Sequence, residues 1–391
     1  MLAIVTSHPI QYQAPLWRAL AASGVHFEVW FLTPHAVQPT LDREFGKTFA
    51  WDTDLLAGYP HRFLPVNADW RMDRFNGVRV QAGWRSLLRE HGVTHLWIEG
   101  WRFATLWQAA FAAHRAGVAV WLRGESHDLR REAGVRAQLK RWVLARLFAR
   151  VDRFLCIGTA NRRFYRARGI EPSRLVAAPY CIDHEGFARA AAALRPERAS
   201  RRRRWQVPDD AICLLFCGKL ISKKRPLDLV AAAEQAVLPG GRKLHLLFVG
   251  DGRLRGDLET RLRSRGAPGA TLAGFLNQSE IPAALVAADC LVLPSDHGET
   301  WGLVVNEALA AGLPAIVSDR CGCAEDLALP QGAAHVYPCG DISALARAIE
   351  QVTLHPPPAA LLLRLGEAHS PQRTAEAVAA LVGRGGPALS S

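Results

Sequence analysis

The sequence has 391 residues and lacks any apolar run long enough to cross a membrane. A helix that spans a bilayer needs about 18 or more consecutive apolar residues, so we expect no transmembrane segment. The amino-terminal stretch also lacks a basic region, and its first apolar run, MLAIV, is too short for the core of a signal peptide. We therefore expect a cytoplasmic protein whose chain opens with a strand and then a helix.

Cysteines are present, but they lack the spacing of a disulfide framework or of a zinc site. Four of the eight lie in apolar strand-like runs, where a thiol acts as a small hydrophobe: Cys156, Cys213, Cys217 and Cys290. Cys321 and Cys323 form the one close pair, and no second ligand pair stands at the spacing that zinc sites show. We expect reduced thiols and no bound metal.

The charge is strongly of one sign, with a formal net charge of +12. This balance favours an anionic partner and leaves three open: nucleic acid, a phosphorylated substrate or an acidic membrane surface. The nucleic-acid alternative has no fold-specific motif behind it, so we expect no nucleic-acid binding. Nearly half of the residues are apolar and about a fifth are charged, which is typical of a soluble globular enzyme.

Short apolar runs alternate with helix-like stretches along the whole chain. The expected strands of the first half span 2–8, 25–32, 94–100, 118–124, 153–158 and 175–180. Those of the second half span 212–218, 244–250, 271–275, 290–296, 314–319 and 335–338. Runs without polar alternation are typical of strands covered on both faces, and strands that alternate with helices indicate parallel sheets. The pattern therefore predicts an α/β protein with two Rossmann-like, doubly wound domains.

The length of the chain also favours two domains. We expect an N-terminal domain over 1–187, a linker with a helix over 188–208 and a C-terminal domain over 209–365. The last residues, 384–391, are expected to be disordered.

The linker carries a run of four arginines, Arg201 to Arg204. Two interpretations are open: a patch that binds an anion, and a solvated helix face.

The stretch GETWGLVVNEALAAGLP (298–314) places two glutamates, Glu299 and Glu307, eight positions apart. It predicts a loop after one strand and a helix from about Gly302 to Ala311. Because ligands of a doubly wound sheet bind beyond the carboxyl ends of the strands, Glu299 lies at the binding edge. The start of the helix suits a phosphate, and Glu307 can accept hydrogen bonds from a ribose diol. The alternative is that both are surface carboxylates that complement the helix N-terminus.

A second stretch, FCGKLISKKRPLDL (216–229), follows the first strand of the second domain. It places Gly218 and Lys219 at the strand end and Lys223, Lys224 and Arg225 in the next turn. Cations there face the same edge as the helix at Gly302, where they can stabilise a diphosphate leaving group as its charge grows. The alternative is a solvated basic turn. The stretch FVGDGRLRGDLE (248–259) adds a Gly-Asp-Gly turn after another strand.

These stretches resemble the segments of retaining glycosyltransferases of family 4, which have the GT-B fold of two Rossmann-like domains facing across a cleft. GETWGLVVNEALAAGLPAIVSD (298–319) resembles the E-x7-E segment, GKLISKK (218–224) the G-R-L-x-x-x-K segment and VGDG (249–252) the V-G-x-G turn. APYCIDHEGF (178–187) is similar to the segment that closes the N-terminal domain. SPQRTAEAVAALV (370–382) is similar to the last helix, so the helix over 366–383 is expected to cross back to the N-terminal domain.

The resemblance implies a role for each matching residue of the second half. Glu307 is expected to bind the ribose of a nucleotide diphosphate sugar, and Glu299 the hydroxyls of the donor sugar. Lys219 and Lys224 are expected to hold the diphosphate. The remaining donor contacts implied are Gly218, Gly250, the backbone of Gly302, Leu303 and Val304, and the backbone near Phe275, which frames the base. The family keeps the anomeric configuration and usually needs no metal, so no metal and no other cofactor is expected.

The first half departs from the family pattern in two places. SHPIQYQAPL (7–16) stands where the family has a glycine-rich turn, and it offers His8 and Gln11 as polar contacts. LRGESHD (122–128) stands where the family often places a histidine, and it offers Glu125 and His127 together with Arg123. In the second half, Lys219 replaces the family's arginine and so loses bidentate phosphate geometry.

Ten of the twelve tryptophans fall in the first 150 residues. Trp51, Trp97, Trp101 and Trp107 are candidates for stacking on a sugar or lipid acceptor, and the alternative is that they are core aromatics.

The basic stretch 130–154 places Leu139, Trp142, Val143, Leu147 and Phe148 near one helix face, with cations opposite. It predicts either a solvated helix over the sheet or peripheral docking on anionic lipid at the inner membrane face.

Together these features predict a retaining, metal-independent glycosyltransferase with a nucleotide-sugar donor and a glycan or lipid-linked acceptor. Bacterial surface polysaccharide or glycolipid synthesis is the setting that family analogy suggests. Two alternatives remain: a nucleotide-sugar hydrolase or epimerase, and a degenerate GT-B subunit that binds nucleotide and supports a partner.

Overall fold

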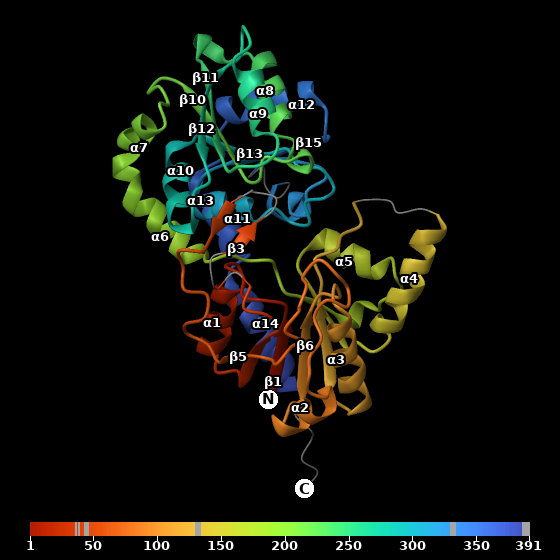
Figure 1. Cartoon of the computed structure of the whole chain (residues 1–391). Helices are drawn as coiled ribbons and strands as arrows, with labels where there is room; N and C mark the ends of the chain where they lie inside the picture. Colours follow the sequence, from red (N-terminus) through yellow and green to blue (C-terminus); the bar gives the residue numbers. More distant parts are fainter. Residues whose placement is uncertain (36, 38–39, 43–46, 130–133, 329–333, 385–391) are drawn as a thin grey trace. The chain divides into compact units, whose positions relative to one another are not determined.

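The structure (Figure 1) is a computed structural model that describes residues 1–35, 37, 40–42, 47–129, 134–328 and 334–384. The chain divides into two compact units. Unit 1 comprises Met1–Gln38, Asp54–Tyr180 and Pro371–Ser391, and unit 2 comprises Pro39–Thr53 and Cys181–Ser370. The tail expected to be disordered lies outside the described residues from 385 on.

Unit 1 is built on a seven-stranded sheet with the order β5-β2-β1-β6-β7-β8-β9, in which neighbouring strands are parallel. The strands are β1 (Leu2–Thr6), β2 (Phe27–Phe31), β5 (His61–Phe63), β6 (His95–Glu99), β7 (Ala119–Arg123), β8 (Arg153–Cys156) and β9 (Leu175–Ala177). Its helices are α1 (Ala14–Ala22), α2 (Trp84–Glu90), α3 (Ala104–Arg115), α4 (Val135–Phe148), α5 (Thr159–Arg166) and α14 (Pro371–Arg384).

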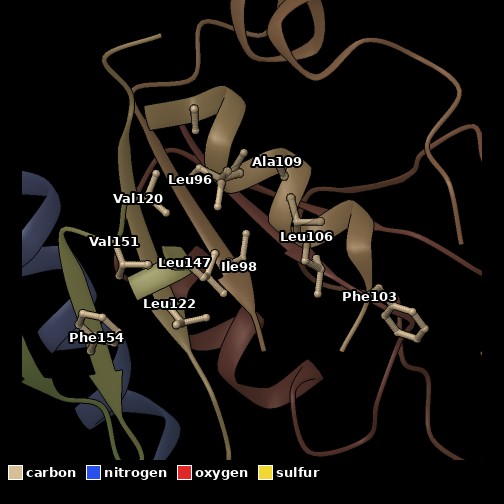
Figure 2. Close-up of a cluster of buried hydrophobic side chains, with 14 of the residues drawn as sticks. Leu96, Ile98, Phe103, Leu106, Ala109, Val120, Leu122, Leu147, Val151 and Phe154 are labelled. Atoms are coloured by element: carbon tan, nitrogen blue, oxygen red, sulfur yellow. The ribbon is translucent and has the colours of Figure 1, made fainter. Parts of the chain in front are cut away.

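Alternate residues of each strand point to opposite faces of this sheet, and helices pack on both faces. On one face Leu96 and Ile98 of β6 pack with Leu106 of α3 and Leu147 of α4, as Figure 2 shows. On the other face Trp97 packs edge-on against Trp17 of α1, with ring centroids 5.3 Å apart. Double coverage explains why the strands read as continuous apolar runs in the sequence.

Unit 2 contains a six-stranded parallel sheet with the order β12-β11-β10-β13-β14-β15. The strands are β10 (Ile212–Cys217), β11 (Leu244–Val249), β12 (Gly269–Gly274), β13 (Cys290–Leu293), β14 (Ala315–Ser318) and β15 (Ala334–Tyr337). Its α-helices are α6 (His184–Leu194), α7 (Arg198–Arg204), α8 (Pro226–Gln235), α9 (Arg255–Leu262), α10 (Ile281–Ala287), α11 (Leu303–Ala310), α12 (Ile342–Leu354) and α13 (Ala359–Glu367). Counted within the unit, the strand order is 3-2-1-4-5-6, the order of Rossmann sheets.

The expected α/β class and parallel sheets are confirmed, and each of the twelve predicted strands overlaps an observed one. Two features were not predicted. The short strand β5 has only three residues, too few for a period to show. The hairpin of β3 (Thr40–Asp42) and β4 (Lys47–Phe49) comes from the first half of the sequence but belongs to unit 2.

Helix α14 packs against α1 and β9 of unit 1. The Thr374 hydroxyl on this helix donates to the Pro179 carbonyl over 2.9 Å. Within the described ranges, no helix has both the length and the apolarity to cross a membrane.

The arginine run of the linker lies on α7, where Arg202 is buried, with 5% of its surface exposed. Its guanidinium bonds to the Asp289 carboxylate over 3.1 Å and to the carbonyls of Pro208 and Ala211 over 2.6 Å each. Both interpretations of the run are therefore wrong for Arg202, which does not face solvent or an anion. It joins α7 to the residues that directly precede strands β10 and β13.

Candidate functional site

The candidate site of unit 2 lies where β10 and β13 are neighbours in the sheet. The chain runs outward in opposite directions from this pair of strands, so the loops at their carboxyl ends diverge and leave room for a ligand. The loop after β10 carries Gly218, Lys219 and Lys224, and the loop after β13 carries Ser295, Glu299 and Gly302. The sequence expectation that both loops share one edge of the sheet is met.

An ion pair joins these two loops. The Lys224 ammonium donates to the Glu299 carboxylate, whose Oε2 also accepts from the Ser295 hydroxyl over 3.1 Å. Only 17% of the Lys224 side chain and 13% of the Glu299 side chain are exposed. Neither residue is thus a solvated surface charge, and the surface alternative is wrong for both. An ammonium has three donors, so Lys224 can hold Glu299 and still bind a further anion.

Glu307 lies inside α11 with 6% of its surface exposed. Burial raises the pKa of its carboxyl to about 7, while the hydrogen bond from the Gln278 amide to Oε1, at 3.5 Å, acts in the opposite direction. The surface alternative is therefore wrong for Glu307 as well. A buried carboxyl with one long hydrogen bond retains the capacity to accept more, as a vicinal diol would require.

Gly302 is the residue at which the loop turns into α11. Its φ of +105° lies in the left-handed region, and a Cβ there would stand 2.6 Å from Leu293 Cδ2. Glycine is therefore required by the backbone and by packing. The N–H groups of the first helical turn, at Leu303 and Val304, lie beyond the reach of helical acceptors and define an anion-binding end.

Glycines also hold the neighbouring turns together. A Cβ on Gly250 would lie 2.0 Å from the Gly218 carbonyl oxygen, so the turn after β11 packs directly on the turn after β10. The Gly218 N–H donates to Val249 over 2.9 Å, and the Leu220 N–H donates to Asp251 over 2.9 Å. This interlock gives Gly218 and Gly250 a structural role, and it fixes the backbone on both sides of Lys219, at Gly218 and Leu220.

The paired cysteines support the loop that carries Glu299. The N–H of Gly322 donates to the Glu299 carbonyl over 3.2 Å, and the N–H of Cys323 donates to Trp301 over 3.1 Å. Burial raises the pKa of both thiols, Cys321 and Cys323. The part of the chain that the structure describes holds no group of His, Cys, Asp and Glu side chains able to bind a metal.

A segment from the first half of the sequence reaches the loop after β12, which carries Phe275 and Gln278. The Asn277 amide donates to the Ala50 carbonyl over 2.8 Å, and the Ser279 N–H donates to the Asp52 carboxylate over 3.2 Å. Sequence reasoning placed Gln278 in the stretch 274–282 without giving its side chain a role, and it missed Asp52, because the partners of both residues lie far away in the chain.

In unit 1, His8 and Gln11 follow β1, at the switch point between β1 and β6. The ring of His8 lies 2.8 Å from the Ser7 hydroxyl and edge-on to His35, with centroids 5.1 Å apart. Burial, and then the nearby His35 and Arg102, lower the pKa of His8 to about 4, so its ring is neutral at pH 7. Gln11 is partly exposed at the same edge.

Glu125 and His127 follow β7. The Tyr180 hydroxyl donates to Glu125 over 2.5 Å, and His127 Nδ1 accepts from the Leu129 N–H over 3.3 Å. Arg123 is 2% exposed, lies over the Tyr180 ring and stands 3.9 Å from Glu99, whose pKa burial raises to about 7. Sequence reasoning missed Glu99 and Tyr180. The signal for Glu99 was its place as the last residue of a strand beside Arg123.

Three of the four candidate tryptophans are placed by packing in unit 1. Trp97 is fully buried, and Trp101 stacks on Phe164 with centroids 6.1 Å apart, so the core interpretation holds for both. Trp107 lines an apolar pocket of about 700 Å³ together with Phe75, Trp84 and Phe111. Trp51 lies in unit 2, between the two residues that bind Asn277 and Ser279.

Two Rossmann-type units, one with a buried carboxyl and an ion pair at its switch point, define the class of GT-B proteins. Solved structures with this fold can be superposed on nearly the whole chain. A glycosyltransferase from Rickettsia africae has a TM-score of 0.70 at 11% identity and covers 99% of this chain and 98% of its own. The Anabaena protein HepE in complex with UDP has a TM-score of 0.68 at 14% identity, with coverage of 98% and 99%.

Family models match both halves of the sequence. Residues 9–181 match the glycosyl transferase 4-like domain, and residues 197–368 match glycosyl transferases group 1. The chain therefore belongs to this family of glycosyltransferases, as its E-x7-E segment predicted.

A curated relative with a specific name is the GDP-mannose-dependent alpha-(1-6)-phosphatidylinositol dimannoside mannosyltransferase of Mycobacterium tuberculosis. It is 32% identical over 221 residues, which is 54% of this chain and 52% of the relative. The chain thus matches about half the length of this relative.

Proposed function

We propose that the protein is a glycosyltransferase that moves a sugar from a nucleotide diphosphate sugar to a hydroxyl group. The observation that carries this proposal is the Lys224–Glu299 ion pair at the switch point of unit 2, beside the N-terminus of α11. Buried Glu307 lies one turn further along the same helix. One loop and one helix thereby present a cation, backbone N–H groups and two carboxyls to a single ligand.

The donor would use these groups in order along its length. Lys219, Lys224 and the first turn of α11 would hold the diphosphate, because ammonium groups and helix N-termini both favour phosphate. Glu307 would accept hydrogen bonds from the ribose, and Glu299 would contact hydroxyls of the donor sugar. The backbone near Phe275 would frame the base. The mycobacterial relative is named for its use of GDP-mannose and the HepE structure holds UDP, so both GDP and UDP belong in a binding test.

The transfer we propose retains the anomeric configuration and needs no metal. The bond between the anomeric carbon and the phosphate oxygen breaks while the acceptor oxygen attacks the same face of the sugar. The departing phosphate oxygen takes the acceptor's proton, so no separate general base is required. Lys219 and Lys224 would stabilise the negative charge that grows on the diphosphate, the role that a metal has in other transferases.

For the acceptor we propose a glycan or a lipid-linked molecule. The relative named above acts, by its name, on a phosphatidylinositol dimannoside. His8, Gln11, Glu125 and His127 are the candidate contacts in unit 1, because they follow the carboxyl ends of its strands. The proposed setting is the cytoplasmic side of a bacterial membrane, in surface polysaccharide or glycolipid synthesis.

Calorimetric titration of the protein with UDP, GDP and ADP, first without metal and then with magnesium, tests the donor site. We expect one nucleotide to bind selectively and without magnesium. Absence of binding to all three would contradict the proposal and favour a degenerate subunit. Product analysis with the matching nucleotide sugar tests the reaction, since release of free sugar or an epimer without acceptor would favour the hydrolase or epimerase.

A further inference from the structure

Helix α4 (Val135–Phe148) has two apolar faces, and only one of them is buried. Ala137, Leu144, Leu147 and Phe148 pack into unit 1, where Figure 2 shows Leu147 among the core side chains. Leu139, Trp142 and Val143 are 57%, 54% and 39% exposed, and Val135 is 81% exposed. The expectation that Leu147 and Phe148 share a face with Leu139 and Trp142 is therefore wrong.

The exposed residues form a continuous stripe. Positions 135, 139, 142 and 143 follow the spacing i, i+4, i+7 and i+8, which places them on one side of a helix. Ten large apolar side chains are exposed in the described part of the chain, and four of them lie in this one helix of 14 residues. Single exposed apolar residues are ordinary, but a cluster of them marks an interaction surface.

Cations lie beside the stripe and at its end, and α4 contains no acidic residue. Its charged residues, all exposed, are Arg136, Lys140, Arg141 and Arg146. The Arg146 guanidinium lies over the Trp142 ring at 3.4 Å from its centroid, so a positive charge covers the largest apolar side chain of the stripe. Just beyond the helix, Arg150 lies 5.0 Å from the ring of Phe111, which lines the apolar pocket beside α3.

We propose that α4 docks on an anionic lipid bilayer, with Val135, Leu139, Trp142 and Val143 inserted among the headgroups. Arg136, Lys140, Arg141 and Arg146 would lie against the lipid phosphates. An apolar stripe flanked by cations fits the boundary between headgroups and acyl chains, where both kinds of side chain find their preferred surroundings. A nucleic acid would satisfy the cations but leave the aliphatic stripe in water.

The choice of a lipid partner rests on the proposed function in one respect, the lipid-linked acceptor. The surface itself can be tested without any transfer reaction. Its failure would leave nucleotide binding at Lys224 and Glu307 untouched, and failure of nucleotide binding would leave vesicle binding untouched.

The test is sedimentation with vesicles of phosphatidylcholine, alone or mixed with phosphatidylglycerol, at low and high salt. We expect binding to the mixed vesicles at low salt and much weaker binding at high salt. The variant Leu139→Ser with Trp142→Ser should bind about tenfold or more weakly, because it removes about half of the inserted apolar surface. Charge reversal by Lys140→Glu with Arg141→Glu should have an effect of at least similar size.

The matched control is Val237→Ser with Leu354→Ser, which removes two exposed apolar side chains of unit 2, 77% and 51% exposed. It should bind vesicles like the unmodified protein. Nucleotide titration of each α4 variant checks that the chain is folded, since α4 contributes no residue to the donor site. Absence of binding to the mixed vesicles, or equal binding of the α4 variants and the control, would overturn the proposal.

Discussion

Ser279 donates hydrogen bonds from both its backbone N–H and its hydroxyl to the carboxylate of Asp52, 227 residues earlier in the chain. Asn277 completes the clamp by donating to the Ala50 carbonyl over 2.8 Å. Between these two lies Gln278, whose amide reaches the buried carboxyl of Glu307. A segment of the first half of the sequence thus holds the loop that contacts the expected ribose ligand.

This clamp predicts that Asp52→Ala weakens nucleotide binding. Loss of one charged hydrogen-bond acceptor costs about 1.5 to 3 kcal/mol locally, and we expect part of this, about a 3- to 10-fold weaker affinity, to reach the nucleotide. Calorimetric titration measures it. Ser279→Ala should have a smaller effect, because the Ser279 N–H can still donate to Asp52. The double variant should bind no more weakly than Asp52→Ala, because that change already removes both bonds. Additive effects would contradict the coupling.

The Lys224–Glu299 pair predicts a division of labour between binding and turnover. Lys224→Ala should weaken nucleotide affinity about 10- to 100-fold, since it removes a charged donor to the diphosphate. Glu299→Gln should lower turnover with little change in nucleotide affinity, because Glu299 is proposed to contact the sugar alone. The exposed Lys223 in the same turn provides the control, and Lys223→Ala should change affinity much less than Lys224→Ala. Equal losses would favour a general charge effect.

Burial of Glu307 predicts a pH dependence of nucleotide binding. Its pKa of about 7 means that the carboxyl is largely protonated at pH 6 and largely ionised at pH 8. An ionised carboxylate is the better acceptor for a ribose diol, so affinity should rise with pH over this window. Titrations at both pH values measure it. Glu307→Gln should bind more weakly and without this pH dependence, and a pH-independent unmodified protein would contradict the ribose role.

The same raised pKa predicts the effect of pH on stability. The folded protein binds a proton at Glu307 more tightly than the unfolded chain does, where the pKa is 4.5. The stabilising contribution is complete below pH 4.5 and is lost as pH rises through about 7. Glu307→Gln should therefore gain stability relative to the unmodified protein as pH rises from 5 to 8. Thermal unfolding at the two pH values measures it, and a constant difference would contradict the assignment.

Gly302 predicts a structural requirement at the start of α11. Gly302→Ala places a Cβ 2.6 Å from Leu293 and strains a backbone with φ of +105°, so it should cost about 2 to 5 kcal/mol of unfolding free energy. Gly256, inside α9 and without a neighbour at its Cβ position, provides the control. Gly256→Ala should be neutral or stabilise slightly. Denaturant unfolding measures the free energy of unfolding of both variants. Equal values would show that Leu293 and the backbone can move to accept a side chain at position 302, and would contradict the requirement.

Arg202 predicts that the arginine run acts through structure. Arg202→Ala removes a buried guanidinium that donates to Asp289 and to two carbonyls, although Arg198 and the Cys213 N–H still donate to Asp289, so it should cost about 1 to 3 kcal/mol. The exposed neighbour Arg203 provides the control, and Arg203→Ala should change stability by less than about 0.5 kcal/mol. Unfolding curves of the two variants compare them. If the two variants were equally stable and both bound anions more weakly, the interpretation of the run as an anion-binding patch would be favoured instead.

Much of the fold could be predicted from the sequence alone. Strands that are covered on both faces are apolar at nearly every position. Runs such as 212–218 and 244–250 can therefore be recognised as strands although polar and apolar residues do not alternate in them. The site could be located in outline for a related reason. Parallel strands bring their carboxyl ends to one edge, so residues after two strands, such as Lys224 and Glu299, meet there whatever the helices between them do.

The tertiary structure alone decided the features that depend on distant partners. The Asp52–Ser279 clamp joins positions with no periodic relation, and Arg202 is buried because Asp289 and two carbonyls surround it. The two faces of α4 illustrate the same limit. A helical pattern tells which residues share a side, but only the packing of Leu144 and Leu147 against the sheet decides which side is turned to the core and which is left for a partner.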